Sequence, residues 1–102
     1  MSWDWYHKKD TNYFIRINLV KQVKKYMITK LEANTPFQLI PPVAFTYSGG
    51  RVLITHLERH KYMSRFKREF TLLRVHLDNG TFVPLDKLRT KHLLKISQIL
   101  FN

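Results

Sequence analysis

Apolar residues recur at intervals of three and four between residues 17 and 31. They fall within one arc of a helical wheel, which is typical of an amphipathic helix that buries one side. The members of this arc are Leu19, Val20, Val23, Tyr26, Met27 and Leu31. The run Asn34-Thr35-Pro36 ends the pattern, because proline cannot continue a helix. We therefore predict a helix from Ile17 to Leu31, with a start that could reach back to Asn12.

A first pair of strands is predicted on either side of Gly49-Gly50. Residues 43–47 and 52–56 are rich in apolar and β-branched side chains, and glycine supplies the positive φ that a two-residue hairpin loop requires. One face of this hairpin is expected to carry Val43, Phe45, Tyr47, Val52, Ile54 and His56. The other, more polar face is expected to carry Ala44, Thr46, Ser48, Arg51, Leu53 and Thr55. Prolines on both sides should confine residues 37–40 to an edge or irregular strand.

A second hairpin is predicted around Asn79-Gly80, which lies between residues 70–77 and 82–85. Asn-Gly is the strongest short signal for a type I′ turn of two residues. Pairing across such a turn would place one set of side chains on a shared face. That set comprises Leu73, Val75, Leu77, Phe82 and Pro84.

The C-terminal part of the chain predicts a second amphipathic helix. Its apolar stripe comprises Leu85, Leu88, Leu93, Ile96, Ile99 and Leu100. Asp86 would lie in the first turn, where an acid suits the helix dipole. His92 falls near the middle of the stripe and is expected to be a buried, hydrogen-bonded histidine rather than a catalytic base. Leu94 and Phe101 lie off the stripe and are candidate contacts for a second copy or a protein partner, although fraying of the last turn would also explain Phe101.

The segment from Leu57 to Phe70 is ambiguous. Tyr62, Met63, Phe66 and Phe70 fit helical spacing, while three of them also fit alternation, and we interpret the segment as a short helix or a charged connector. The predicted fold is therefore α+β: one small domain over residues 1–102, in which two antiparallel hairpins form a sheet bracketed by an N-terminal and a C-terminal helix. Residues 1–11 are treated as an arm.

Charge narrows the choice of partner. The 102 residues include 18 Lys and Arg against 7 Asp and Glu, a formal net charge of +11 with a pI near 10.2. Such an excess favours a polyanionic partner, and nucleic acid first. The chain has no cysteine, which excludes disulfides and thiolate metal sites and is compatible with the reducing cytoplasm. Its longest apolar stretches, such as residues 39–45, are much shorter than the roughly 20 residues of a membrane span, so no membrane partner is expected.

The middle of the chain is its most basic part. Phosphate-binding candidates there are Arg51, Arg59, Lys61, Arg65, Lys67, Arg68 and Arg74. Tyr62, Phe66 and Phe70 lie among these cations, and Tyr62 and Phe66 are the candidates for base stacking. Single-stranded nucleic acid requires this combination of cations and rings. The alternative is that these rings belong to the core. Single-stranded DNA or RNA is slightly favoured over duplex for this reason.

Two further surfaces could contact nucleic acid. The polar side of the first helix carries Asn18, Lys21, Gln22, Lys25 and Thr29. Such residue types read base edges in the major groove, but every amphipathic helix also has a solvated face. Lys21 and Lys25 are kept as phosphate-binding candidates. Near the N-terminus, Trp3, Trp5 and Tyr6 precede Lys8 and Lys9 and could either stack on bases or dock the terminus on the domain.

Enzyme signatures are weak. The seven carboxylates form no paired set that could hold hard cations, and the three glycines are explained by turns, so no phosphate-binding loop is predicted. His56 and His60 would share a face of a helix and could bind zinc only if Glu58 or a distant His joined them. We expect no catalytic residues, no metal and no cofactor. The alternative to nucleic-acid binding is a small inhibitor or accessory subunit, phage or mobile-element encoded, that docks on a nucleic-acid-processing enzyme or a ribonucleoprotein.

Overall fold

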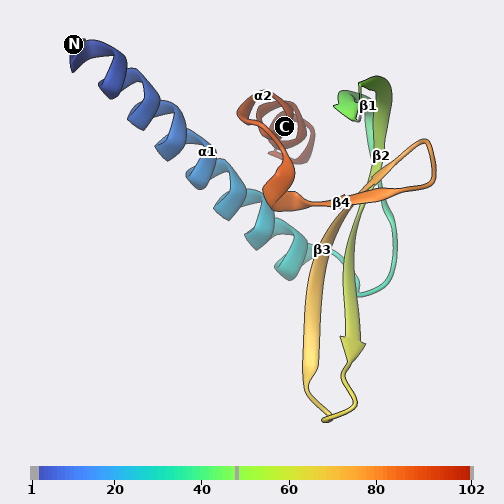
Figure 1. Cartoon of the computed structure of the whole chain (residues 1–102). Helices are drawn as coiled ribbons and strands as arrows, with labels where there is room; N and C mark the ends of the chain where they lie inside the picture. The colour runs from blue at the N-terminus through green and yellow to red at the C-terminus, as the bar shows by residue number, and fades with distance from the viewer. Residues whose placement is uncertain (1–2, 48, 102) are drawn as a thin grey trace.

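The computed structural model describes residues 3–47 and 49–101, and it describes the side chains of residues 13–46 and 49–101. Within these residues, two α-helices, one 3₁₀ turn and four strands follow one another (Figure 1). They are α1 (Trp3–Lys30), β1 (Phe37–Tyr47), β2 (Gly50–Met63), β3 (Glu69–Leu77), β4 (Phe82–Pro84), η1 (Leu85–Lys87) and α2 (Thr90–Phe101). The strands form one antiparallel sheet in the order β1-β2-β3-β4. The prediction of an α+β fold with an antiparallel sheet and flanking helices is confirmed.

The core lies between the two helices and one face of the sheet. The predicted arc of α1 is buried there except for Tyr26, which is partly buried. The buried residues of the sheet are Leu39, Val43, Phe45, Ile54, Leu57, Val75, Leu77 and Val83. Those of η1, α2 and the residues between them are Leu85, Leu88, His92, Leu93 and Ile96. Among the described residues no helix combines the length and the apolar character needed to cross a membrane.

Helix α1 begins at Trp3, well before the predicted start at Ile17 or Asn12. Figure 1 shows why periodicity missed this part: the N-terminal half of α1 extends away from the sheet, so it has no apolar partner to impose a pattern. Residues 3–11, treated above as an arm, therefore have helical backbone. The side chains of Trp3, Trp5 and Tyr6 lie outside the described part of the chain.

The β1–β2 hairpin turns one residue earlier than predicted. Tyr47 pairs with Gly50, and Gly49 supplies the positive φ of 77°. Because the pairing moves by an even number of positions, Phe45 still shares a face with Val52, and Val43 with Ile54, as predicted. β1 is an edge strand, as expected, and it is irregular between Gln38 and Val43, where two prolines stand.

The prediction that His56 shares a face with Ile54 is wrong. Ile54 pairs with Leu77 but His56 pairs with His76, so one extra residue of β2, Thr55, forms a bulge between them. The bulge lets Ile54 and Leu57 both point into the core, where each is fully buried. From His56 onward, the even-numbered residues of β2 therefore face away from the helices.

The segment predicted as a connector is a strand instead. β2 continues to Met63, and its pairing with β3 runs from Leu57 opposite Val75 to Met63 opposite Glu69. A tight loop closes this hairpin: the Ser64 N–H donates to the Arg68 carbonyl at 2.8 Å. The hairpin projects beyond both helices (Figure 1), so its outer half has no buried residue and lacks the strict alternation of a covered strand.

The β3–β4 turn also differs from the predicted type. Its loop has three residues, 78–80, and the Leu77 N–H donates across it to the Thr81 carbonyl at 2.9 Å. Gly80 has a φ of 86°, whereas Asn79 has no positive φ, which a type I′ turn would need. The Asp78 side chain accepts a hydrogen bond from the Leu53 N–H at 3.1 Å, which ties the loop to β2.

This one-residue change reverses β4. Val83 lies opposite Val75 and is buried, while Phe82 and Pro84 face away from the core. The predicted face with Leu73, Val75, Leu77, Phe82 and Pro84 is therefore wrong for its last two members, because an odd shift in pairing moves every side chain to the other face.

The C-terminal helix begins at Thr90, later than predicted, and Asp86 lies in η1 before it. His92 is buried, as expected, with 6% of its surface exposed. Its Nδ1 accepts a hydrogen bond from the Arg89 N–H at 3.4 Å. Leu94 is exposed, and the half-exposed Phe101 ring packs edge-on against Tyr26 at 5.5 Å.

Candidate nucleic-acid interface

The face of β2, β3 and β4 that points away from the helices carries rings and charges in place of a second apolar layer. We call it the outer face; on β2 it holds residues 56, 58, 60 and 62, on β3 residues 70, 72, 74 and 76, and on β4 residues 82 and 84. The pleat of the sheet assigns them, since cross-strand partners share a face and side chains alternate along each strand. Leu57, Val75 and Val83 lie on the opposite face and are buried.

Six rings form a row along this outer face. We call it the ring row; its members are His56, His60, Tyr62, Phe70, His76 and Phe82. At the inner end the rings of His56 and His76 stack at 4.3 Å between centroids, and Phe82 lies 5.7 Å from His76. At the outer end Tyr62 stacks on Phe70 at 5.5 Å and lies 5.9 Å from His60.

Charged groups occupy the space between the two ends of the ring row. Glu58 Oε1 accepts a hydrogen bond from His76 Nε2 at 2.8 Å, and the same oxygen lies 4.0 Å from Nη1 of Arg74. Its other oxygen lies 3.7 Å from the Nδ1 of His60. Burial raises the pKa of Glu58, but the hydrogen bond from His76 and the neighbouring charges of His76, His60 and Arg74 together bring it below its ordinary value. Glu58 therefore stays ionised and anchors the imidazoles.

His56 behaves differently. Burial, and then the positive charge of His76, lower the pKa of His56, while Glu58 partly opposes them. Its Nδ1 lies 3.0 Å from the Thr55 hydroxyl, within hydrogen-bond distance. His56 is therefore neutral at pH 7 and presents a flat uncharged ring at the inner end of the row.

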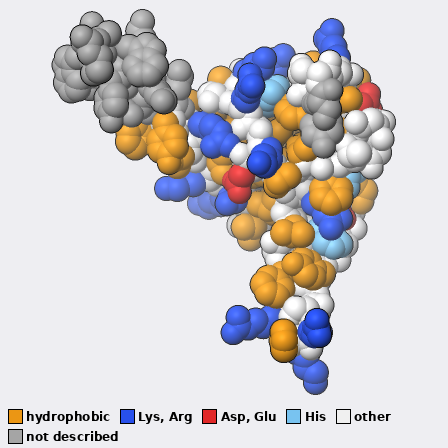
Figure 2. Space-filling model, viewed as in Figure 1, with side chains coloured by type: hydrophobic (Ala, Val, Ile, Leu, Met, Phe, Trp, Pro, Cys, Tyr) orange, Lys and Arg blue, Asp and Glu red, His pale blue; other side chains and the backbone are white. Residues whose placement is uncertain are grey.

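The loop that closes the hairpin concentrates positive charge. We call residues 64–68 the tip. Arg65, Lys67 and Arg68 are all exposed there, and Phe66 has 81% of its surface exposed. The Arg65 guanidinium lies 5.9 Å from the centre of the Phe66 ring. Figure 2 shows Lys and Arg side chains gathered at the far end of the projecting hairpin, with hydrophobic side chains along its length.

The structure brings some of the sequence-predicted site residues together. Tyr62 and Arg74 lie on the outer face, and Arg65, Phe66, Lys67 and Arg68 lie at the tip that continues it. The alternative placed the two candidate rings in the core. It is wrong, because Tyr62 and Phe66 are both exposed.

Other predicted residues lie elsewhere. Arg59 projects from the opposite face and its Nη2 donates to the Leu31 carbonyl at the end of α1, at 2.8 Å. Lys61 is on the same side as Arg59 and pairs with Glu69. The remaining predicted cations are exposed but stand apart from the outer face, on α1 and at the β1–β2 turn. They are Lys21, Lys25 and Arg51.

Phe70, noted above among the interleaved rings, also lies on the outer face. Sequence reasoning missed the rest of the ring row, which is His56, His60, His76 and Phe82. The signal that could have found them is the alternation His56, Glu58, His60, Tyr62, which is polar and aromatic at every second position. This alternation can be identified only when residues 57–63 are recognised as a strand.

The zinc hypothesis required His56 and His60 to share a face of a helix. They share a face of strand β2 instead, together with Glu58. Within the part of the chain that the structure describes, no three His, Asp or Glu side chains are arranged to hold a metal ion. Comparisons with models of protein families, with curated proteins and with solved structures found no match to this chain.

Proposed function

We propose that this chain is a small non-enzymatic protein that binds single-stranded DNA or RNA across the outer face of its β2–β3 hairpin. The observation that carries the proposal is the ring row, which leads from the β4 end of the sheet to a tip with three cations. A strand face with exposed rings and flanking cations can stack unpaired bases while its Lys and Arg side chains contact phosphates.

The dimensions of the outer face suit a short single strand. From Phe70 to His76 the β3 backbone advances roughly 20 Å, at about 3.4 Å per residue. Such a length accommodates about four nucleotides, the low end of the roughly 4–16 nucleotides that comparable domains cover. Duplex nucleic acid would hide its bases from these rings, which is why single strands are favoured.

The charge of the chain supports the same partner. Glu58 is the one carboxylate on the outer face itself, and it is already bound to His76. The net charge of +11 attracts a polyanion from solution and steers its approach. We place the protein in the cytoplasm, which its cysteine-free sequence favours.

Fluorescence anisotropy of labelled single-stranded DNA, single-stranded RNA and duplex DNA, each measured at several salt concentrations, tests the proposal. We expect tighter binding of single strands than of duplex. The logarithm of the affinity should fall linearly with the logarithm of the salt concentration, with a slope of roughly −0.7 per neutralised phosphate. Absence of binding to all three probes at low salt would overturn the proposal, and equal binding to all three would reduce it to unspecific charge attraction.

A further inference from the structure

β3 has a free edge. β4 pairs only with Arg74, Val75 and His76, whereas β3 begins at Glu69. Residues 69–73 therefore have a strand partner on the β2 side alone, and no other strand covers them in the part of the chain that the structure describes. An unpaired strand edge is a template for a further strand.

The pairing pattern tells which backbone groups this edge offers. In an antiparallel ladder, alternate residues bond to the same neighbour, and the Leu77 N–H bonds toward β4 by donating to the Thr81 carbonyl. Counting back by twos along the regular strand β3, Thr71 and Leu73 direct their N–H and C=O groups away from β2. Pro84 agrees with this parity, because it lies opposite Arg74 and has no N–H to donate.

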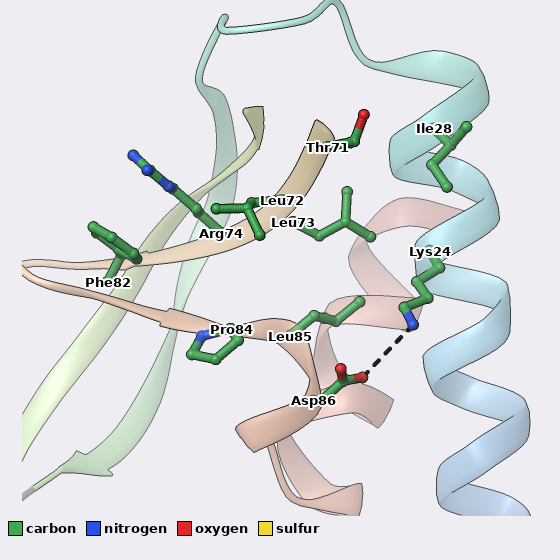
Figure 3. Close-up of a pocket in the computed structure, with 10 residues that line it drawn as sticks. All are labelled: Lys24, Ile28, Thr71, Leu72, Leu73, Arg74, Phe82, Pro84, Leu85 and Asp86. Carbon is green, nitrogen blue, oxygen red and sulfur yellow. Dashed lines mark ion pairs between the residues drawn. The ribbon is translucent and has the colours of Figure 1, made fainter. Parts of the chain in front are cut away.

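A groove of about 460 Å³ runs beside these groups, between β3 and α1. Figure 3 shows Ile28 and Lys24 on the α1 wall and Leu72 and Leu73 on the β3 wall, with the Lys24–Asp86 ion pair at 3.8 Å at one end. Ile28 and Leu72 are both exposed although they are large and apolar. The groove has the size of a ligand site and an apolar lining.

We propose that this groove takes up an extended acidic segment of a partner protein, which adds as a strand to β3. Donor and acceptor pairs two residues apart are what an added strand engages, and the apolar walls would receive its alternate side chains. Charge selects an acidic segment, since the chain carries +11 and the lining of the groove holds two cations, Lys24 and Arg74, against one carboxylate, Asp86. The same charge argues against a second copy at this edge, because it would bring +11 against +11. The inference rests on the strand edge and not on the proposed nucleic-acid binding, although Arg74 and Phe82 border both sites.

The test is a titration of ¹⁵N-labelled protein with a short peptide of alternating Glu and Val, followed by amide chemical shifts and hydrogen exchange. We expect shifts and slowed exchange at the Thr71 and Leu73 amides. Replacing Glu by Lys in the peptide should abolish binding at low salt. Shifts confined to the tip, or equal binding of the Lys peptide, would overturn the proposal.

Two variants distinguish strand addition from nonspecific binding of the peptide. Thr71→Pro removes one outward N–H at an edge position where proline is tolerated, and should weaken peptide binding about fivefold to tenfold. Thr71→Val keeps that N–H and should bind as the unaltered protein does. As a check that needs no folded variant, a peptide N-methylated at every second residue should lose affinity; if it binds as well as its parent, backbone pairing is refuted.

Discussion

The Arg74 guanidinium lies over the Phe82 ring, with Cζ 4.3 Å from the ring centroid. Its Nη1 is 4.0 Å from Glu58, so one cation joins β2, β3 and β4 on the outer face. Its Nε is buried and has no hydrogen-bond partner among the described residues. A phosphate or base oxygen that approached the exposed part of Arg74 would find a guanidinium whose plane is already held by the Phe82 ring.

Arg74→Lys should weaken binding of single-stranded DNA about three- to tenfold, although it keeps the charge. Lys cannot stack its plane on Phe82, and cation–π contacts are worth roughly 0.5–2 kcal/mol. Anisotropy titrations at one salt concentration measure the effect. Arg51→Lys, at the distant β1–β2 turn, is the matched control and should change nothing; equal losses in both variants would remove the special role of Arg74.

Tyr62→Ala should lower affinity for single strands by about 1–3 kcal/mol, the usual contribution of one stacked base. The ring has an exposed face and stacks on Phe70, so its loss interrupts the outer end of the ring row. Tyr62→Phe should retain most of the affinity. Tyr13→Ala, which removes an exposed ring from α1, serves as control, and an effect as large there would contradict a stacking role for Tyr62.

Replacing the three tip cations by Gln (Arg65→Gln, Lys67→Gln, Arg68→Gln) should reduce the salt slope of single-strand binding. Each lost phosphate contact lowers its magnitude by roughly 0.7. The control makes the same change of net charge on α1 with Lys21→Gln, Lys25→Gln and Lys30→Gln. If the α1 variant loses more of the slope than the tip variant, nucleic acid binds on the helix and not on the hairpin.

Stability should fall as the pH drops below about 6.5, partly because of His92. Burial lowers the pKa of His92 from 6.5, and the positive charges of Lys91, Arg89 and Lys95 lower it further. The unfolded chain thus takes up the proton first as the pH falls, so the stabilising contribution is complete above pH 6.5 and is lost as the pH falls through the lower folded pKa.

His92→Phe keeps a ring against Phe45 and should flatten this pH dependence, which thermal unfolding between neutral and mildly acidic pH would measure. Part of the slope should remain, because the pKa of His56 is also lowered by burial and by His76. His60→Gln is the control. The interpretation fails if His92→Phe and the unaltered protein lose stability in parallel.

Leu57→Ala should cost roughly 2–5 kcal/mol of unfolding free energy, because Leu57 is fully buried opposite Val75 just after the bulge. Leu53→Ala on the same strand removes a more exposed side chain and should cost much less. Urea unfolding compares the two. Similar losses would mean that the bulge does not turn Leu57 into the core.

Sequence patterns predicted the elements that touch the core and missed those that do not. Leu19, Val23 and Met27 repeat because a sheet covers them, whereas the part of α1 before Ile17 has no such cover and no such repeat. The same reason hid the outer half of β2. Residues 58–63 are buried on neither side, so Tyr62 fitted the spacing of a helix as well as the alternation of a strand.

Two single-residue shifts in strand pairing kept the sequence from predicting the whole site. The bulge at Thr55 and the three-residue loop before Thr81 each move a strand by one position, which exchanges its faces. His56 and Phe82 thereby join the outer face. Asn79-Gly80 fits both a two-residue and a three-residue loop, and the bond between Asp78 and Leu53, which is distant in sequence, accompanies the longer one.

The projecting hairpin should open locally without unfolding of the whole domain. Beyond Leu57 and Val75 neither strand has a buried residue, so the outer half is held by its backbone ladder and its rings alone. Protection of amide hydrogens should therefore fall along the hairpin from Leu57 toward Ser64, in a graded sequence of partial openings below the global unfolding free energy. A ligand bound along the ring row would close these openings and convert the least protected part of the sheet into one that exchanges only with the whole domain.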